Sequence, residues 1–215
     1  MTYRHSFVLG LMMITSLSCT SQSLWGASEI NTYTKTDFAM DTVVSETLYT
    51  TGEDITADVI ATLKNVEENL ISWTEESSQI YQINQNAGST VTVSQETAAY
   101  LKQVLKLSEA SEGAMDPTIG KIIRLWDIDG ENPHIPEEKE LNALLKNVGY
   151  KKIILDGNKV TLPAGMTLDL GAAGKGLGCD AAEQILEKQK EVSGMILNLG
   201  GSSVMSYGSK PDGSS

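Results

Sequence analysis

The chain has 215 residues, of which 40 % are hydrophobic, and its 16 basic and 28 acidic side chains give a formal net charge of −12. This composition supports one substantial core or two small ones and excludes a fibrous or broadly disordered protein. A surface this acidic repels phosphate backbones and anionic lipid, so no nucleic-acid partner is expected. An anionic ligand would need local backbone donors, a metal ion or a placed lysine.

The first 18 residues are typical of an export signal. Arg4 provides a short basic start, an apolar run follows over residues 7–14, and small polar residues occupy positions 16–18. The apolar run is too short to cross a bilayer, which takes roughly 20 residues of helix. We therefore expect residues 1–18 to be a signal peptide and the protein to be exported, to the periplasm or another extracytoplasmic location.

Cys19 follows the leader directly and resembles the lipid-acceptor cysteine of bacterial lipoproteins, although Ser16 stands where a branched aliphatic residue is usual. The alternative is ordinary cleavage, with Cys19 incidental or removed. Residues 19–35 are rich in Ser and Thr and are expected to form a tether from a lipid anchor to the folded domain. Cys179 is the only other cysteine, which excludes a metal–cysteine cluster and leaves a Cys19–Cys179 disulfide open.

The first half of the chain predicts a strand and two helices. Residues 38–49 are rich in Val, Thr and aromatic residues with rough alternation, which favours a strand. Apolar residues at helical spacing predict one amphipathic helix over about residues 54–71 and another over about residues 95–111, which Gly113 ends.

The second half alternates helices with short strands. Pro136 suits the first turn of a helix that runs to about Asn147, and Gly149 follows as its stop. Two β-rich runs flank Asp156-Gly157, a strong signal for a tight hairpin. The remaining expected elements are a strand at 166–170, a helix at about 176–188 and two short strands within 194–208. Together the elements predict a mixed α+β fold.

A glycine-rich loop at residues 171–176 lies between the strand predicted at 166–170 and the helix predicted from about residue 176. Its glycines would let the backbone approach a ligand closely, and the start of the helix would offer free N–H donors to a phosphate. Lys175 could add a positive charge, and Asp169 could bind a hydroxyl or a metal ion. A crowded turn with a solvated lysine is the alternative. The glycine spacing fits neither a Walker loop nor a dinucleotide-binding fingerprint.

Two other loops carry weaker signals. Asp116-Pro117 favours a turn, and Asp116 alone is more often a cap or turn residue than a catalyst. Asn198 and Gly200-Gly201 follow an apolar run, which is typical of a β-turn or bulge. Neither loop by itself indicates a function.

Five segments nevertheless occur together in an order and spacing typical of one family. They are FAMDT at 38–42, EENLISWTEESSQIYQIN at 67–84, GAMDPTIGKIIRLW at 113–126, LDLGAAGKGLGCDAA at 168–182 and ILNLGGSSVMSYGSKPDG at 196–213. With them the chain resembles the ApbE-type flavin transferases, FAD:protein FMN transferase. The resemblance extends from about residue 36 to the last residue, so residues 36–215 are interpreted as a flavin transferase domain.

The resemblance implies an α+β fold that binds FAD in an elongated cleft. With Mg²⁺, such a protein transfers the FMN moiety of FAD to a Thr or Ser hydroxyl of a target redox protein and releases AMP. The cofactor-binding residues implied by position are Met40, Ala114, Met115, Asp116, Asp169 and Lys175. Ala172 stands where the family supplies a main-chain carbonyl ligand to Mg²⁺. Thr74 occupies a position that is usually aromatic, and Trp73 is adjacent.

Family members continue beyond the KPDG segment, and their later part completes the Mg²⁺ site. We therefore expect the domain to be incomplete at its C-terminal end, with the catalytic residues beyond Ser215, and the 215-residue chain alone to transfer little FMN. Alternatives are a FAD pyrophosphatase that gives FMN and AMP, a non-catalytic exported flavin-binding lipoprotein, and an anchored interaction module.

Overall fold

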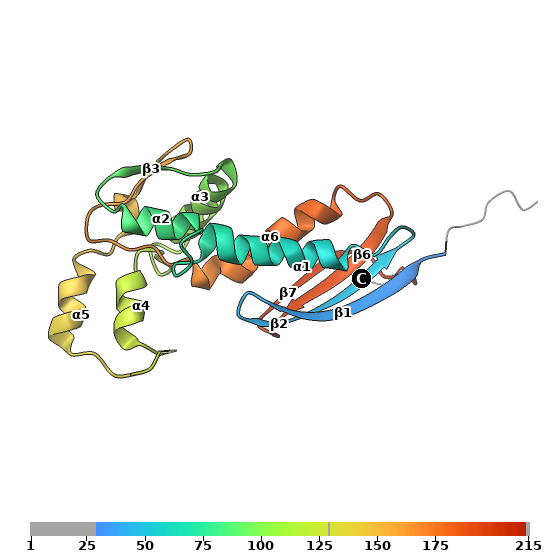
Figure 1. The fold of residues 1–215 in the computed structure, drawn as a ribbon, viewed down its shortest axis with the longest axis horizontal. Helices are drawn as coiled ribbons and strands as arrows, with labels where there is room; N and C mark the ends of the chain where they lie inside the picture. Colours follow the sequence, from blue (N-terminus) through green and yellow to red (C-terminus); the bar gives the residue numbers. More distant parts are fainter. Residues whose placement is uncertain (1–28, 129, 214–215) are drawn as a thin grey trace, which may run out of the picture.

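The computed structural model describes residues 29–128 and 130–213. Its elements are β1 (Asn31–Ala39), β2 (Thr42–Thr50), α1 (Thr56–Asn65), the π-helix η1 (Val66–Ile71), α2 (Gln79–Gln85), β3 (Thr90–Thr92), α3 (Gln95–Ala110), α4 (Gly120–Trp126), α5 (Glu138–Leu145), the 3-10 helix η2 (Tyr150–Lys152), β4 (Ile154–Asp156), β5 (Lys159–Thr161), α6 (Gly171–Leu186), β6 (Val192–Leu199) and β7 (Ser203–Gly208). This combination of helices and antiparallel sheets confirms the predicted α+β class. The molecule is elongated, with the larger sheet at one end and α2 to α5 at the other (Figure 1).

The larger sheet has four antiparallel strands in the order β1-β2-β6-β7, and α1 and α6 lie across one of its faces (Figure 1). Val44 and Leu48 of β2 are fully buried, as are Leu197 and Leu199 of β6. Burial at every second residue is what a sheet covered on one face requires. The main core therefore lies between this sheet and the two helices.

The smaller sheet has the strand order β3-β5-β4 and confirms the predicted hairpin. Asp156 pairs with Lys159, so Gly157 and Asn158 form a two-residue turn. Gly157 has φ 57°, a value that glycine adopts without steric cost. The predicted helix over 95–111 is also confirmed as α3, whose first turn is capped by Ser94 Oγ accepting from Thr97 N at 3.0 Å.

The strand predicted over residues 38–49 is wrong in one respect: the chain reverses within it. Met40 and Asp41 form a turn, so residues 38–39 belong to β1 and residues 42–49 belong to β2. The tether predicted over residues 19–35 is likewise wrong for residues 31–35, which pair with β2 as part of β1. Neither Gly nor Asn marks the turn, which is why the sequence pattern reads as one continuous strand.

The region around the glycine-rich segment also differs from the prediction. Residues 166–170 form no named strand and make only an isolated bridge, between Thr167 and Ile119. The helix expected from about Gly176 begins at Gly171, so the predicted loop is the first turn and a half of α6. Glycine weakens isolated helices, and here packing against other elements outweighs that weak propensity.

The predicted helix over 54–71 is confirmed, although it changes character at Val66. Residues 56–65 are α-helical and residues 66–71 form a π-helix, with Ser72 N donating to Glu67 O at 2.9 Å. The expected helix after Pro136 is confirmed as α5. A π-helical turn widens the helix and is frequent at functional sites.

The expected signal peptide and the lipidation site at Cys19 lie outside the described residues. Within residues 29–128 and 130–213, none of the helices is both long enough and apolar enough to span a membrane. Cys179 is a half-buried residue of α6, and burial raises the pKa of its thiol. Its pairing with Cys19 stays untested.

One buried carboxylate stands out in the larger sheet. Glu46 of β2 is 1 % exposed and pairs in register with Lys35, yet neither of its side-chain oxygens has a hydrogen-bond partner. Burial raises the pKa of Glu46 from about 4.5 to about 7; Lys35 opposes this rise, and Asp54 and Asp37 add to it. Because the unfolded chain releases this proton more readily, stability attributable to Glu46 is present below about pH 4.5 and is lost as the pH rises through about 7.

We predict that Glu46→Gln raises the free energy of unfolding relative to the unchanged protein by about 1–3 kcal/mol at pH 8, because it removes an uncompensated buried charge. The advantage should shrink toward pH 5, where Glu46 holds its proton. Urea unfolding followed by circular dichroism at several pH values measures the difference. Glu53→Gln, at an exposed position, is the control, and parallel pH profiles for Glu46→Gln and the unchanged protein would contradict the prediction.

Candidate functional site

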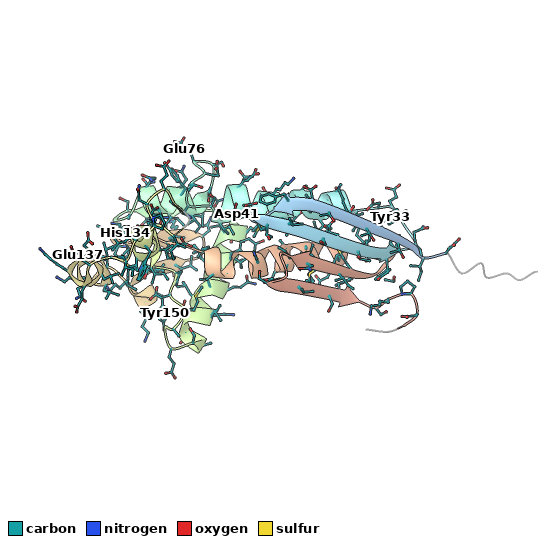
Figure 2. All side chains as sticks on the ribbon, turned by 90° about the horizontal axis from the view of Figure 1, so that it is seen from below. Tyr33, Asp41, Glu76, His134, Glu137 and Tyr150 are labelled. Carbon is teal, nitrogen blue, oxygen red and sulfur yellow. The ribbon has the colours of Figure 1, made fainter. Side chains whose placement is uncertain are left out.

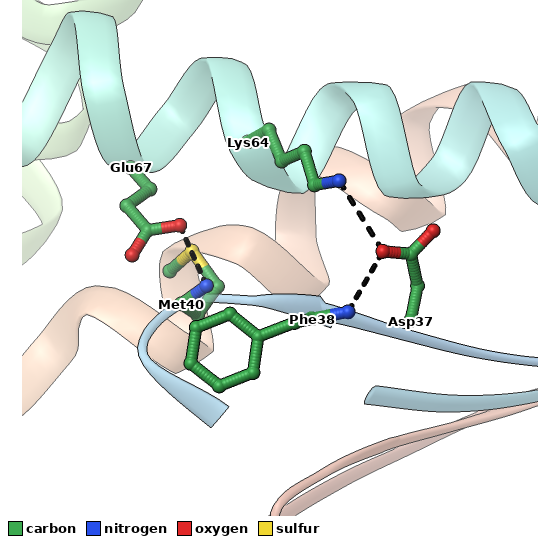
Figure 3. Close-up of polar contacts among 5 residues, drawn as sticks. All are labelled: Asp37, Phe38, Met40, Lys64 and Glu67. Atoms are coloured by element: carbon green, nitrogen blue, oxygen red, sulfur yellow. Dashed lines mark hydrogen bonds and ion pairs between the residues drawn. The ribbon is translucent and has the colours of Figure 1, made fainter. Parts of the chain in front are cut away.

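The turn between β1 and β2 is held by a carboxylate from another part of the chain. Met40 and Asp41 have φ values of 58° and 54°, the left-handed region that costs a residue with a side chain about 1–2 kcal/mol. Glu67 Oε2 accepts from Met40 N at 2.7 Å, and Glu67 Oε1 accepts from Asp41 N at 3.0 Å. Figure 3 shows the Glu67 carboxylate above the turn. One side chain therefore satisfies both amides of a strained turn.

This turn forms one wall of a groove of about 690 Å³. The lining residues come from the hairpin tip, from the end of α1 with η1 and the loop after it, and from the start of α6: Phe38, Ala39, Met40, Asp41, Lys64, Glu67, Glu68, Ile71, Ser72, Trp73, Thr74, Glu75, Asp169, Gly171, Gly174 and Lys175. Figure 2 places Asp41 near the middle of the molecule, where the sheet gives way to the helical end, and Tyr33 toward the far end of the sheet. The groove thus opens where the two halves of the molecule meet.

The start of α6 forms the opposite wall. Asp169 Oδ1 accepts from Gly171 N at 2.8 Å, and Asp169 N donates to Pro117 O at 2.8 Å. Lys175 Nζ donates to Ser202 Oγ at 3.0 Å, which links α6 to the turn between β6 and β7. The positive end of the α6 dipole therefore faces the groove, beside one lysine ammonium group.

Two of the four glycines of α6, Gly174 and Gly178, serve packing against neighbouring elements. A Cβ atom on Gly174 would lie 2.9 Å from Ile71 Cδ1, and one on Gly178 would lie 3.0 Å from Leu63 Cδ2 and 3.3 Å from Met40 Cε. Gly174 belongs to the segment expected to approach a ligand and does line the groove, although Ile71 fills the space beside it. Gly178 lies beyond that segment and packs against α1 and the hairpin turn.

An aromatic ring borders the groove from the loop after η1. Trp73 is 43 % exposed, and the Arg124 guanidinium lies 4.2 Å from the centroid of its ring. Burial lowers the pKa of Arg124, and the charge of Asp169 opposes this shift. Ser72 Oγ accepts from the amides of Thr74 and Glu75 at 3.2 and 3.1 Å, which fixes the loop that carries the tryptophan.

The charge of the groove is acidic overall. Its lining holds five carboxylates, from Asp41, Glu67, Glu68, Glu75 and Asp169, against the two ammonium groups of Lys64 and Lys175. One of these cations is already paired, because Lys64 Nζ lies 3.2 Å from an oxygen of Asp37 (Figure 3). The Phe38 amide, with Lys64 adding to its effect, holds the pKa of Asp37 below its ordinary value.

Three of the six predicted cofactor-binding residues meet in the groove, and three do not line it. Met40 is brought together with Asp169 and Lys175, which share one distant segment of the sequence. Ala114 is exposed on a neighbouring loop, and Met115 packs against the core with its sulfur 3.5 Å from Ser108 Oγ. Whether these residues bind FAD stays a prediction.

Asp116 has a structural role in the loop that carries it. Its Oδ1 accepts from Thr118 N and Thr118 Oγ1 at 2.8 and 2.6 Å, and its Oδ2 accepts from Tyr150 N at 2.9 Å. Thr118 Oγ1 in turn accepts from Gly149 N at 2.8 Å. The carboxylate thus ties its own loop to the start of η2, while Pro117 beside it accepts from the amide of Asp169.

The described residues do not by themselves fit a preformed magnesium site. Ala172 is an exposed residue in the first turn of α6, where a helical carbonyl ordinarily accepts the amide four residues later. Within residues 29–128 and 130–213, no group of three or more His, Cys, Asp or Glu side chains is arranged to hold a metal ion. One carbonyl alone is far from the six or so oxygen ligands that Mg²⁺ takes.

Several groove residues were not among the predicted site residues, among them Lys64, Glu67 and Ile71, and Trp73 was noted only as the neighbour of Thr74. Three of them belong to the segment at 67–84 that carries the resemblance, but no residue pattern distinguishes them there. Glu67 in particular is one of two consecutive glutamates on a helix, which ordinarily indicates a solvated face. Its role depends on a contact with the hairpin that only folding creates.

The chain is similar to known proteins in both sequence and structure. A family model described as the ApbE family matches residues 40–215. Two FAD:protein FMN transferases are each 28 % identical to the chain: that of Treponema pallidum over 88 % of this chain and 56 % of the relative, and that of Klebsiella pneumoniae over 81 % and 56 %. The chain thus spans about half the length of these curated relatives.

Solved structures agree with the family match. The ApbE protein of Thermotoga maritima superposes with a TM-score of 0.78 and 29 % identity, over 84 % of this chain and 60 % of that one. The apo form of the Pseudomonas stutzeri flavinyl transferase ApbE gives a TM-score of 0.77 over 86 % of this chain and 61 % of that one; at 21 % identity it supports the fold alone.

We predict that Asp116→Asn lowers the free energy of unfolding by about 1.5–3 kcal/mol, because an amide cannot accept hydrogen bonds at both of its ends. Asp156→Asn is the matched control, since Asp156 is exposed and Asn suits the same hairpin. Chemical denaturation of both variants measures the loss. Equal stability of the two variants would show that the Asp116 network contributes nothing.

Proposed function

Because the chain belongs to the ApbE family, we propose that the protein binds FAD in the groove and transfers its FMN moiety to a Thr or Ser hydroxyl of a target redox protein, releasing AMP. The observation that carries this proposal is the meeting of Met40, Asp169 and Lys175 in one groove. Met40 lies far in the sequence from the segment that holds both Asp169 and Lys175, and the family resemblance implies that all three bind FAD.

The groove residues have properties that suit a flavin dinucleotide. Trp73 offers exposed aromatic surface to a planar ring, and the largely buried Met40 adds a small apolar area to the wall of the groove. Lys175 and the N-terminal end of α6 offer positive charge to a pyrophosphate. Asp169 already accepts the amide of Gly171, so this carboxylate is held at the wall where a ribose or ribityl hydroxyl could donate to its other oxygen.

The proposed reaction exchanges one phosphorus–oxygen bond for another. The acceptor hydroxyl oxygen bonds to the phosphorus of the FMN half and loses its proton, and the bond from that phosphorus to the bridging oxygen breaks, so AMP leaves with that oxygen. This chain's part is to bind and orient the pyrophosphate and to supply charge beside it. Figure 2 places His134, the histidine of the described residues, apart from Asp41, so it is not a candidate base in the groove.

Mg²⁺ is proposed to enter together with FAD. The support is electrostatic: a groove with five carboxylates and two ammonium groups is a poor host for a pyrophosphate unless a cation accompanies it. An expected consequence is that FAD binds more weakly when divalent cations are removed with EDTA.

Export and lipid attachment through Cys19 are also proposed. The support is the leader sequence, in which a basic start and a short apolar run directly precede a cysteine. An extracytoplasmic location would give access to the exported domains of redox proteins.

The transfer reaction is tested with protein expressed from the complete reading frame, FAD, Mg²⁺ and an apo redox protein that accepts FMN from a characterised FAD:protein FMN transferase. We expect flavin fluorescence to persist on the acceptor after denaturing electrophoresis, with one AMP released per FMN attached. Lys175→Met should weaken FAD binding by about tenfold or more, because a charge-assisted contact is lost.

Lys188→Met is the control for Lys175→Met, since it removes one exposed ammonium group just beyond the other end of α6. AMP release at the same rate with and without acceptor would contradict transfer and indicate FAD hydrolysis. Absence of FAD binding by the unchanged protein would overturn the proposal as a whole.

We predict that the protein incorporates radiolabelled palmitate in a bacterial host and sediments with membranes, and that Cys19→Ala abolishes both. Cys179→Ala is the matched control and should leave labelling intact. Unchanged labelling of Cys19→Ala would rule out this anchor.

A further inference from the structure

We propose that Glu67 is a positioning residue, whose carboxylate holds the strained Met40–Asp41 turn in the form that makes the FAD groove. This inference rests on the proposed function for its binding readout. The contact itself stands on geometry: two hydrogen bonds of 2.7 and 3.0 Å from one carboxylate to two consecutive amides.

Only one of the two central residues of the turn, Asp41, is of a type that usually adopts its conformation. Ala39 and Thr42 are the last paired residues of the hairpin, so Met40 and Asp41 are its two central residues, both with positive φ. Such turns favour Asn-Gly or a similar pair, because most side chains clash in this conformation. Asp adopts positive φ more readily than most residues, whereas Met does not. The conformation of Met40 therefore needs support from outside the hairpin.

Glu67 can support the turn because the helix changes from α to π geometry beside it. It lies near the start of η1, whose widened turn also has Ser72 N donating to Glu67 O. The same short helix supplies Ile71, which packs against Gly174 next to Lys175. η1 therefore contacts both walls of the groove, the hairpin through Glu67 and α6 through Ile71.

The turn conformation determines where the Met40 side chain lies. Met40 is 7 % exposed, and its sulfur and terminal methyl group lie against Gly178, with the methyl group also near Gly174. If the turn relaxed, the amide and the side chain of Met40 would move together, and the wall facing Lys175 would change shape. The fraction of molecules with a binding-competent groove would then fall, and the apparent affinity for FAD would fall with it.

Both oxygens of Glu67 already accept from the turn, so we assign it no direct part in the chemistry. Neighbouring Glu68 also lines the groove but makes no contact of this kind with the turn among the described residues. The two glutamates therefore allow the loss of a clamp to be separated from the loss of a charge.

The test compares Glu67→Gln with Glu68→Gln in protein expressed from the complete reading frame, by titrating FAD and following quenching of its fluorescence. Glu67→Gln replaces one acceptor with a donor that faces an N–H group, so FAD should bind about tenfold to a hundredfold more weakly. Glu68→Gln removes the same charge from the groove without touching the turn, so it measures the effect of the charge alone, and the loss in Glu67→Gln should exceed it at least tenfold.

A second variant pair asks whether the effect acts through backbone strain. Asp41→Gly in the Glu67→Gln background should restore much of the lost affinity, because glycine adopts positive φ freely. Asp41→Asn controls for the loss of the Asp41 charge and should restore less. A loss of stability that arises outside the turn would not be rescued selectively by glycine at position 41.

Amide hydrogen exchange gives a readout that does not depend on FAD. The amides of Met40 and Asp41 should be protected in the unchanged protein and exchange about tenfold faster or more in Glu67→Gln. If Glu67→Gln does not fold, Glu67→Asp serves instead, since its shorter side chain keeps the charge but cannot reach both amides.

The proposal is overturned if the Met40 and Asp41 amides exchange equally fast with and without the Glu67 carboxylate, or if Glu67→Gln and Glu68→Gln lose equal affinity. If the unchanged protein binds no FAD while the two amides still depend on Glu67, the proposed function fails and the clamp on the turn stands.

Discussion

The close packing of α6 against α1 and η1 is the contact on which the arrangement of the groove depends. Gly174 and Gly178 leave room on α6 for side chains from the opposing elements, and a Cβ at either position would come within about 3 Å of one of them. The position of the Lys175-bearing turn relative to the hairpin is therefore set by core packing. Core geometry and groove geometry cannot vary independently.

Hydrogen bonds then hold the two walls of the groove that this packing brings close together. Glu67 holds one wall through the amides of the hairpin turn, while Pro117 and Gly171 hold Asp169 on the other. Asp116 holds the loop that contains Pro117, and Pro117 O accepts from Asp169 N. Asp116, which was expected to bind the cofactor, therefore supports Asp169, which does line the groove. An acidic groove assembled in this way needs local cations to accept a pyrophosphate, which makes Lys175 more important than a single surface lysine would ordinarily be.

Much of the fold could be predicted because local sequence patterns specify most of its helices. Apolar spacing located α1 and α3, and Pro136 with Gly149 bracketed α5. The prediction failed where tertiary contacts overrule local preference. α6 begins at Gly171, within a segment whose glycines disfavour helix by themselves, and the hairpin reverses at Met40–Asp41, where Asp41 is not accompanied by the glycine that usually marks such a turn.

The sequence by itself determined the family and named three residues that the fold gathers, Met40, Asp169 and Lys175, because motifs preserve chemistry in a linear order. Only the tertiary structure decided that Glu67 supports the turn, since its partners lie 26 and 27 positions away and no local pattern couples them. It also decided that Gly174 and Gly178 of α6 serve packing against neighbouring elements. A residue's use depends on which surfaces meet it, and those surfaces exist only once the chain has folded.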